Sequence, residues 1–237
     1  MIVDLFIPCY IDNFFPGTAF NMIKVLEKAG CAVHYNSDQT CCGQPAYTEG
    51  YMDYCKEIGT KFIRDFENDR YIVAPSPSCV AMIKNYYSEM FHNTVLHNEY
   101  KQLRKNIYEF TDFLVNVLHI KNTGAVLEAK ATYHDSCVAL RELQIKQQPR
   151  ELLQQVKGLE LIEMKDSETC CGMGGSFAAR YENFSASLSA QKCANIKATG
   201  AQYVISNDYK CLMHLKKELD ANNIQIMHIA DVLASGI

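Results

Sequence analysis

The stretch QTCCGQPAY, residues 39–47, recurs in altered form as ETCCGMGGS, residues 168–176. Each copy places two adjacent cysteines before a glycine. Adjacent cysteines are poor disulfide partners for each other, because closing so small a ring strains the bond geometry. The two pairs therefore point to another use of sulfur, such as metal binding or redox chemistry.

The cysteines around these two stretches repeat with a nearly constant offset. Four cysteines of the first half recur between 128 and 132 positions later, which chance does not readily explain. The corresponding pairs are Cys9 with Cys137, Cys41 with Cys170, Cys42 with Cys171, and Cys79 with Cys211. We infer a duplicated unit, with the first copy in residues 1–125 and the second in 126–237.

Each unit reads as alternating strands and helices, which predicts an α/β fold of two duplicated Rossmann-like units with parallel sheets. Short apolar runs predict strands at 2–8, 31–36, 70–76, 130–136, 159–164, 201–207 and 224–229. Helical patterns cover 16–30, 48–67, 78–90, 148–156, 176–198 and 208–221. Residues 99–119 also read as helix without a counterpart of similar size in the second half, and we interpret them as a bridge between the halves.

The repeated cysteines fall at the carboxyl ends of the predicted strands. Cys9, Cys79, Cys137 and Cys211 follow strands directly, and both Cys-Cys-Gly segments lie in loops that lead from a strand into a helix. Ligands of open parallel sheets gather at this edge, so we expect four thiols per unit to converge there. A nearby helix N-terminus favours thiolate, the form that binds metal. Gly43 and Gly172 would let the backbone approach and donate amide hydrogen bonds.

Four soft ligands suit an iron–sulfur cluster or zinc. The spacing favours iron–sulfur, because zinc sites usually contain a C-x-x-C knuckle and this chain has none. The three cysteines outside the repeat, Cys31, Cys55 and Cys193, are expected to be small buried hydrophobic residues. His134 and His214 are the histidines best placed to contact the ligand cysteines without binding the metal themselves, although histidines are more often structural.

Composition narrows the possible functions. The 237 residues carry a formal net charge of -4, so no basic surface predicts nucleic-acid binding. No apolar run approaches the roughly 20 residues needed to span a bilayer. The start, MIVDLFIPCYIDN, lacks a cationic region, and we read it as a strand rather than a signal peptide. Eleven cysteines without an export signal fit a reducing compartment, so a cytoplasmic protein is expected.

The motif set resembles the cysteine-rich CCG-domain family. Its members include the cysteine-rich component of heterodisulfide reductase and the iron–sulfur subunits of glycolate oxidase and anaerobic glycerol-3-phosphate dehydrogenase. The resemblance rests on Cys9, Cys41-Cys42-Gly43 and Cys79, and again on Cys137, Cys170-Cys171-Gly172 and Cys211. It covers nearly the whole chain, and it is strongest to the short two-motif members of the lactate-utilization branch.

This resemblance implies an oxidoreductase subunit that carries electrons through iron–sulfur centres, [4Fe–4S] in type, while L-lactate is oxidised to pyruvate. It implies two partners, a ferredoxin-like iron–sulfur protein and a third small subunit. It assigns no catalytic residue. The alternatives are a zinc-binding or thiol-only structural module of such a complex, and a subunit of another 2-hydroxy-acid or disulfide oxidoreductase.

The chain departs from the family pattern at two positions. Where the family has the first cysteine of a C-x-x-C pair, this chain has Ser76 and Asp208. Four cysteines therefore remain in each unit, enough for one [4Fe–4S] centre or one zinc ion. We expect Ser76 to cap the helix that follows it. For Asp208, both a cap and an oxygen ligand stay open.

Overall fold

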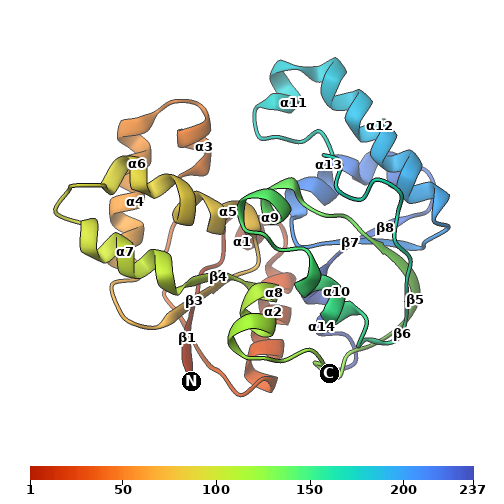
Figure 1. The fold of residues 1–237 in the computed structure, drawn as a ribbon, viewed down its shortest axis with the longest axis horizontal. Helices are drawn as coiled ribbons and strands as arrows, with labels where there is room; N and C mark the ends of the chain where they lie inside the picture. Colours follow the sequence, from red (N-terminus) through yellow and green to blue (C-terminus); the bar gives the residue numbers. More distant parts are fainter.

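Two four-stranded sheets, one in each unit, form the frame of the molecule, which the computed structural model describes over residues 1–237. All paired strands run parallel, in the order β2-β1-β3-β4 in one sheet and β6-β5-β7-β8 in the other. The strands are β1 (Ile2–Leu5), β2 (Ala32–Tyr35), β3 (Tyr71–Ala74), β4 (Ile107–Glu109), β5 (Val126–Tyr133), β6 (Lys157–Leu161), β7 (Tyr203–Ser206) and β8 (Gln225–His228). The predicted α/β fold of two duplicated Rossmann-like units is confirmed (Figure 1).

Helices connect and cover these strands. In the first unit they are α1 (Cys9–Phe14), α2 (Pro16–Lys28), α3 (Gln44–Thr48), α4 (Met52–Asp65), α5 (Pro77–Ala81), the π-helical η1 (Met82–Tyr86), α6 (Tyr87–Phe91), α7 (His97–Asn106), α8 (Phe110–Asp112) and the π-helical η2 (Phe113–Val117). In the second they are α9 (Cys137–Glu142), α10 (Gln147–Leu153), α11 (Phe177–Arg180), α12 (Glu182–Ala198), α13 (Tyr209–Asp220) and α14 (Ile229–Leu233). None of them is both long and apolar enough to cross a bilayer.

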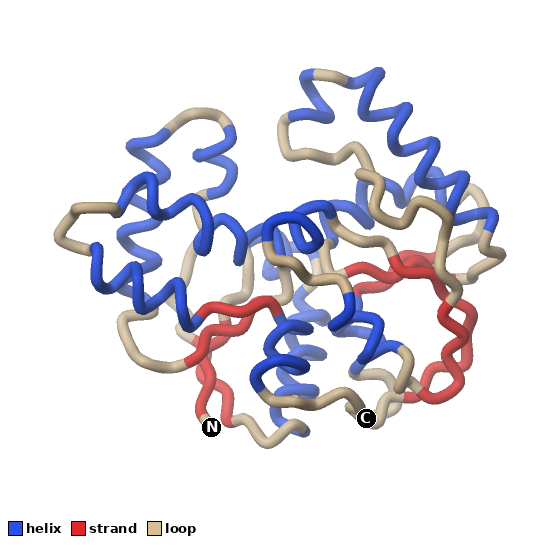
Figure 2. Tube along the Cα trace, viewed as in Figure 1, coloured by secondary structure: helices blue, strands red, loops and turns tan.

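The two units share one hydrophobic core. A cluster of 37 buried residues takes members from both sheets, and α2 of the first unit packs on α14 of the second within it. Figure 2 shows helices filling the space between the two sheets. Asp231 of α14 also accepts hydrogen bonds from Thr18 and Asn21 of α2, at 3.0 and 2.9 Å. Both apolar burial and polar contacts therefore join the copies.

The expectation for residues 99–119 is partly wrong. Helix α7 ends at Asn106, and Ile107–Glu109 form β4, which pairs with β3 just as β8 pairs with β7. This segment therefore does have a counterpart in the second unit. Phe110, Phe113 and Leu114 then belong to the shared core, where α8 contacts α10. The interpretation of this stretch as a bridge holds for its second part.

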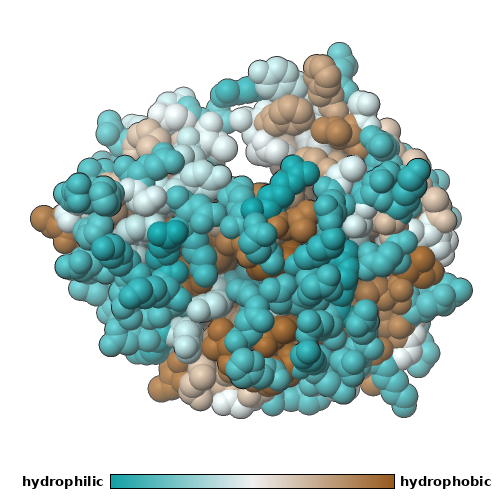
Figure 3. All heavy atoms as spheres, viewed as in Figure 1, coloured by the Kyte–Doolittle hydropathy of each residue, from teal (hydrophilic) through white to brown (hydrophobic).

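The loops that follow β2 and β6 rise above the sheets and end in α3 and α11. Figure 3 shows the surface hollowed between the two lobes that these helices top. Arg180 of α11 forms an ion pair of 2.5 Å with Glu49, which follows α3. The two Cys-Cys-Gly loops therefore lie on the same side of the molecule and are tied to each other at their outer ends.

Candidate metal sites

Four thiols of the first unit come together at the carboxyl ends of β1 and β3, and we call this group the first thiol site. Its members are Cys9, Cys41, Cys42 and Cys79. Cys9 begins α1, Cys79 lies in α5, and the adjacent pair precedes α3. The Cys9 thiol donates to the Cys41 sulfur at 3.7 Å, and Cys42 is close enough to Cys41 and Cys79 for the three thiols to shift one another's pKa. The predicted convergence of thiols is therefore present in this unit.

The second unit repeats this arrangement in what we call the second thiol site. Its members are Cys137, Cys170, Cys171 and Cys211. Cys137 begins α9 and Cys211 lies in α13, and each thiol is close enough to the next to shift its pKa, in the same order as in the first site. The duplication seen in the sequence is thus a duplication of a three-dimensional site.

In each site one thiol is stabilised as thiolate. Hydrogen bonds from Cys42 and then Cys9 lower the pKa of Cys41 to about 2, and the Gly43 amide adds to this from 3.3 Å. Hydrogen bonds from Cys137 and then Cys171 lower the pKa of Cys170 to about 2, again with a glycine amide at 3.3 Å. Because thiolate is the form that binds metal, both sites have a ligand ready at neutral pH.

The two glycines are needed for this geometry. Gly43 has a φ of 83° and Gly172 a φ of 91°, in the region that L side chains rarely adopt. A Cβ at Gly172 would lie 2.5 Å from the Ser185 carbonyl oxygen, and one at Gly43 would lie 3.2 Å from the Cys55 sulfur. Both positions turn the backbone N–H towards the preceding sulfur, as predicted.

The carbonyl oxygen of each glycine accepts a hydrogen bond from a side chain at an equivalent position in the two units. The Cys55 thiol donates to the Gly43 oxygen at 3.5 Å, and the Ser185 hydroxyl donates to the Gly172 oxygen at 2.9 Å. The expectation that Cys55 is only a buried hydrophobic residue is therefore incomplete. Cys55 is fully buried, but it also fixes the loop. Cys31 and Cys193 lie in the shared core.

The two histidines singled out from the sequence lie at the second thiol site. The imidazole of His134 is within 4.8 Å of the Cys171 and Cys211 sulfurs. The Cys171 thiol, and after it the nearby His134 imidazole, lower the pKa of Cys211 to about 7. His214 lies behind the loop, with its Nε2 atom 3.1 Å from the Ser185 hydroxyl.

Ser76 and Asp208 take equivalent positions before α5 and α13 but act differently. The prediction that Ser76 caps its helix is wrong: its side chain makes no capping bond, and its hydroxyl lies 3.5 Å from the Ser78 hydroxyl instead. Ser76 also lines the cavity at the first thiol site. Asp208 does cap α13, with Oδ1 accepting from the Lys210 amide at 3.1 Å.

A cavity of about 130 Å³ is lined by all four cysteines of the first thiol site. Its wall includes Asp208 and Lys210 from the second unit. The Lys210 ammonium donates to Gln44 at 2.6 Å. Burial lowers the pKa of Lys210, but Cys79 and then Asp208 raise it, and the net shift is upward, so Lys210 stays charged. The sequence did not point to Lys210, because it reaches this site only across the contact between the units.

The donor sets fit a bound metal group. Soft sulfur ligands, a preformed thiolate, glycine amides aimed at sulfur and, at the first site, a cavity with a facing cation are what an anionic metal–thiolate centre requires. The four sulfurs of each site could hold such a group. These features define the molecule as a duplicated cysteine-rich α/β protein with two thiol sites suited to metal.

Comparison with known proteins places this class in a family. The family model for the CCG cysteine-rich domain matches residues 3–84 and 131–216, and the chain belongs to this family. It is 40% identical over 240 residues to lactate utilization protein A 2 of Bacillus cereus strain Q1, covering 100% of this chain and 99% of the relative. It is 40% identical over 235 residues to lactate utilization protein A of Halalkalibacterium halodurans, covering 98% and 96%.

A solved structure shares the fold at low sequence identity. It is a hypothetical protein from Helicobacter pylori, with a TM-score of 0.60 and 14% identity. The match covers 100% of this chain and 49% of that one, so the chain spans about half of its length. This likeness supports the architecture of the two units.

Proposed function

We propose that this protein is a cytoplasmic iron–sulfur electron-transfer subunit of a complex that oxidises L-lactate to pyruvate. The observation that carries the proposal is the pair of four-thiol sites, each with a glycine amide directed at a stabilised thiolate. Such hydrogen bonds to sulfur are a means by which proteins set the potential of iron–sulfur centres. The full-length similarity to lactate utilization protein A supplies the substrate.

In this proposal, Cys9, Cys41, Cys42 and Cys79 would hold a [4Fe–4S] centre, and the second thiol site would hold a further metal centre. A bound iron–sulfur centre would supply one-electron transfer, whereas lactate oxidation to pyruvate releases two electrons and two protons. The electrons would pass to a ferredoxin-like iron–sulfur partner, and a third small subunit would complete the complex. Lys210 would offset the negative charge of the first centre.

Zinc is the second candidate, and one distance favours it. Zinc–sulfur bonds of about 2.3 Å in a tetrahedral site place the sulfurs about 3.8 Å apart. The Cys9 and Cys41 sulfurs are 3.7 Å apart. A chain with zinc in both sites would be a structural or assembly module of the complex rather than an electron carrier.

Anaerobic purification separates the two candidates. The chain is isolated under argon together with the proteins that co-purify with it, and iron, acid-labile sulfide and zinc are measured per chain. We expect iron with sulfide and a visible absorbance that bleaches on reduction, and we expect the assembled complex to reduce a dye when L-lactate is added. Cys41→Ser should remove the iron, whereas Cys193→Ser, away from both sites, should keep it. A colourless chain with two zinc ions would overturn the proposal.

A further inference from the structure

Two pairs of exposed aromatic side chains occupy equivalent positions in the two units. Tyr51 directly precedes α4 and Tyr54 lies in its first turn, and Tyr181 and Phe184 take the same places at α12. The equivalence follows from the hydrogen bonds to the two loop glycines, because each bond comes from the residue directly after the pair. The side chains are 61 and 66% exposed in the first pair and 55 and 70% in the second. The duplication has therefore kept two aromatic rings per unit at the surface.

The two pairs lie on the lobes that carry the thiol loops. Each Cys-Cys-Gly loop leads through a short helix, α3 or α11, to its aromatic pair, and Figure 1 shows these helices in the two lobes above the sheets. The ion pair between Glu49 and Arg180 joins the lobes at residues that lie just before Tyr51 and Tyr181. The pairs therefore flank one contact between the units. We call them together the aromatic surface, which consists of Tyr51, Tyr54, Tyr181 and Phe184.

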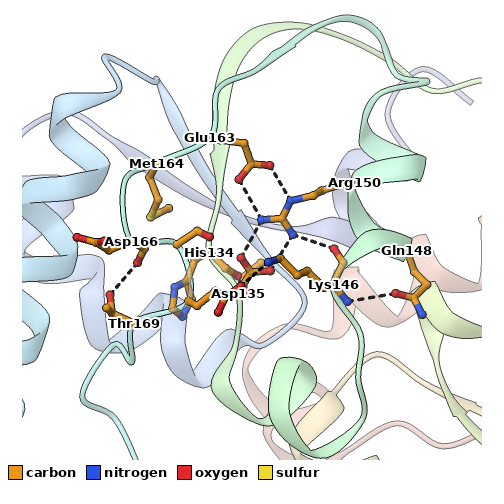
Figure 4. Close-up of polar contacts among 12 residues, drawn as sticks. His134, Asp135, Lys146, Gln148, Arg150, Glu163, Met164, Asp166 and Thr169 are labelled. Atoms are coloured by element: carbon orange, nitrogen blue, oxygen red, sulfur yellow. Dashed lines mark hydrogen bonds and ion pairs between the residues drawn. The ribbon is translucent and has the colours of Figure 1, made fainter.

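The second lobe is fixed at its base. Glu163, at the start of the loop after β6, accepts a hydrogen bond from Arg150 at 2.6 Å, and Thr169 donates to the Asp166 oxygen at 2.9 Å further along the loop (Figure 4). The buried ammonium of Lys192, on α12, donates to the same Asp166 oxygen at 2.9 Å. Helix α12 and its aromatic pair are therefore ordered before any partner binds, which lowers the entropy lost on association.

The fold does not account for aromatic side chains at these positions. The rings of Tyr51 and Tyr54 meet edge-on at 6.4 Å, and Tyr181 lies against Phe177 at 5.3 Å, but none of the four rings of the aromatic surface belongs to a hydrophobic core. Aromatic side chains supply much of the binding energy at protein interfaces, because each buries a large area. Their recurrence in both units points to a surface that is used for binding.

The charges beside the rings decide what can bind there. Apart from the ion pair between the lobes, Asp53, Glu57 and Glu182 face solvent next to the rings, against a single lysine, Lys56. The whole chain also carries a net charge of -4. A second copy of the chain or an anionic membrane would bring like charges together, which opposes binding. Lysine and arginine side chains would complement the carboxylates and could also pack on the aromatic rings.

We propose that the aromatic surface is the docking site for a different protein, whose contact region presents apolar side chains surrounded by lysine and arginine. Such a partner would contact both lobes at once, at the outer ends of the two thiol loops. The inference goes beyond the proposed function, because it assigns the surface that meets a partner and does not depend on which metal the thiol sites hold.

Hydrogen exchange on the full chain locates the contact. The tagged chain is isolated under argon with the proteins that co-purify with it, the other chains are identified by mass spectrometry, and amide exchange in this complex is compared with that of the chain alone. We expect slower exchange in the complex over residues 44–57 and 176–187. Cross-links from Lys56 should reach a region of the partner that is rich in apolar and basic residues.

Substitutions at the surface test the chemistry of the contact, with the partner so identified as the probe. Tyr54→Ser combined with Phe184→Ser should weaken its affinity roughly tenfold or more, because interface aromatics carry much of the binding energy. Asp53→Lys combined with Glu182→Lys should also weaken it and should reduce its dependence on salt. The matched control, Phe20→Ser, removes an aromatic ring that is 64% exposed elsewhere and should leave the affinity unchanged. All five positions are exposed, so the variants should fold.

Each outcome distinguishes this inference from the proposed function. A partner that protects other residues, or that binds the Tyr54 and Phe184 double variant unchanged, would overturn the inference and leave the electron-carrier proposal intact. The absence of any stoichiometric partner would overturn it as well. So would a dimer of the isolated chain, or its binding to phosphatidylglycerol vesicles, if the double variant abolishes either. A colourless zinc-containing chain whose partner still protects this surface would support the inference while overturning the electron-carrier proposal.

Discussion

Ser78 of the first unit donates a hydrogen bond of 2.7 Å to Asp208 of the second, and both residues are buried. The same carboxylate oxygen lies 3.4 Å from the Ser136 hydroxyl. Asp208 therefore links the two thiol sites by hydrogen bonds, since Ser78 is next to Cys79 and Ser136 is next to Cys137. Its charge is held by hydroxyls from both units.

Removal of the hydrogen bond between Ser78 and Asp208 should lower the stability of the protein. Ser78→Ala takes the shortest hydrogen bond from a buried carboxylate, which should reduce the free energy of unfolding by about 1–3 kcal/mol. Urea denaturation followed by circular dichroism measures the change. Ser187→Ala, at an exposed position of α12, should stay within about 0.5 kcal/mol of the unaltered protein. Equal urea midpoints for Ser78→Ala and the unaltered protein would show that this hydrogen bond does not stabilise the fold.

The two loop glycines should respond unequally to alanine. Both have positive φ, which costs an L residue roughly 1–2 kcal/mol. At Gly172 the added Cβ also meets backbone, the Ser185 oxygen, whereas at Gly43 its nearest contact is the Cys55 side chain. Gly172→Ala should therefore cost more stability and more bound metal than Gly43→Ala, as measured by unfolding and metal analysis. Gly17→Ala, in open space on α2, should change neither. The reverse order for the two loop variants would contradict this account.

The ion pair between Arg150 and Asp135 should be among the costliest to break. Two guanidinium nitrogens bind the two Asp135 oxygens at 2.8 Å each, and both side chains are at least nine-tenths buried. Arg150→Met would leave a buried carboxylate unpaired, with an expected loss of about 3–5 kcal/mol in thermal or urea unfolding. Adding Asp135→Asn should recover part of it. Arg180→Met, which breaks an exposed pair with Glu49, should cost less than about 1 kcal/mol.

His228 should make stability fall in mild acid. Burial lowers the pKa of His228, although the carboxylates of Asp231 and Asp208 oppose the shift. Its Nδ1 accepts from the Ala230 amide, so Nε2 carries the proton and donates to the Pro75 oxygen at 3.1 Å. Because the folded pKa lies below the unfolded value of about 6.5, the unfolded chain binds more protons as the pH drops through that value, and stability is lost.

Comparison with His228→Gln isolates this contribution. At pH 7 the variant should be less stable, because Gln does not reproduce both hydrogen bonds. Between about pH 7 and pH 5, the range around the unfolded pKa of histidine, the stability difference from the unaltered protein should shrink. A difference that stays constant over this range in urea denaturation would rule out titration of His228 as the cause.

Much of the frame can be read from the sequence, because the repeat marks equivalent strands twice. The strand before each of Cys9, Cys79, Cys137 and Cys211 is visible as a short apolar run ending near the thiol. Strand β4 escapes prediction because Ile107–Glu109 is only three residues long and follows directly on a helical pattern. Its assignment depends on pairing with β3, a tertiary contact that local periodicity does not record.

The partners of the sites are harder to predict than their sulfurs. Lys210 and Asp208 act on the first unit from the second, and nothing near them in the sequence signals that contact. Serine is a residue type typical of helix caps, yet the Ser76 hydroxyl lies against the Ser78 hydroxyl and leaves the helix uncapped. The sequence did hold a clearer signal for His134. Aligning the two copies on Cys9 and Cys137 places His134 at the position of Phe6, a core residue, which marks the imidazole as unusual.

The packing of α2 against α14 has a consequence for how the two copies can evolve. Helices α2 and α14 bury each other's apolar faces. Deleting or replacing one unit would therefore expose the apolar helix face of the other unit to solvent. The two units can therefore diverge at their thiol sites, as the difference between Phe6 and His134 shows. Substitutions in the interface between α2 and α14, by contrast, must remain compatible with each other.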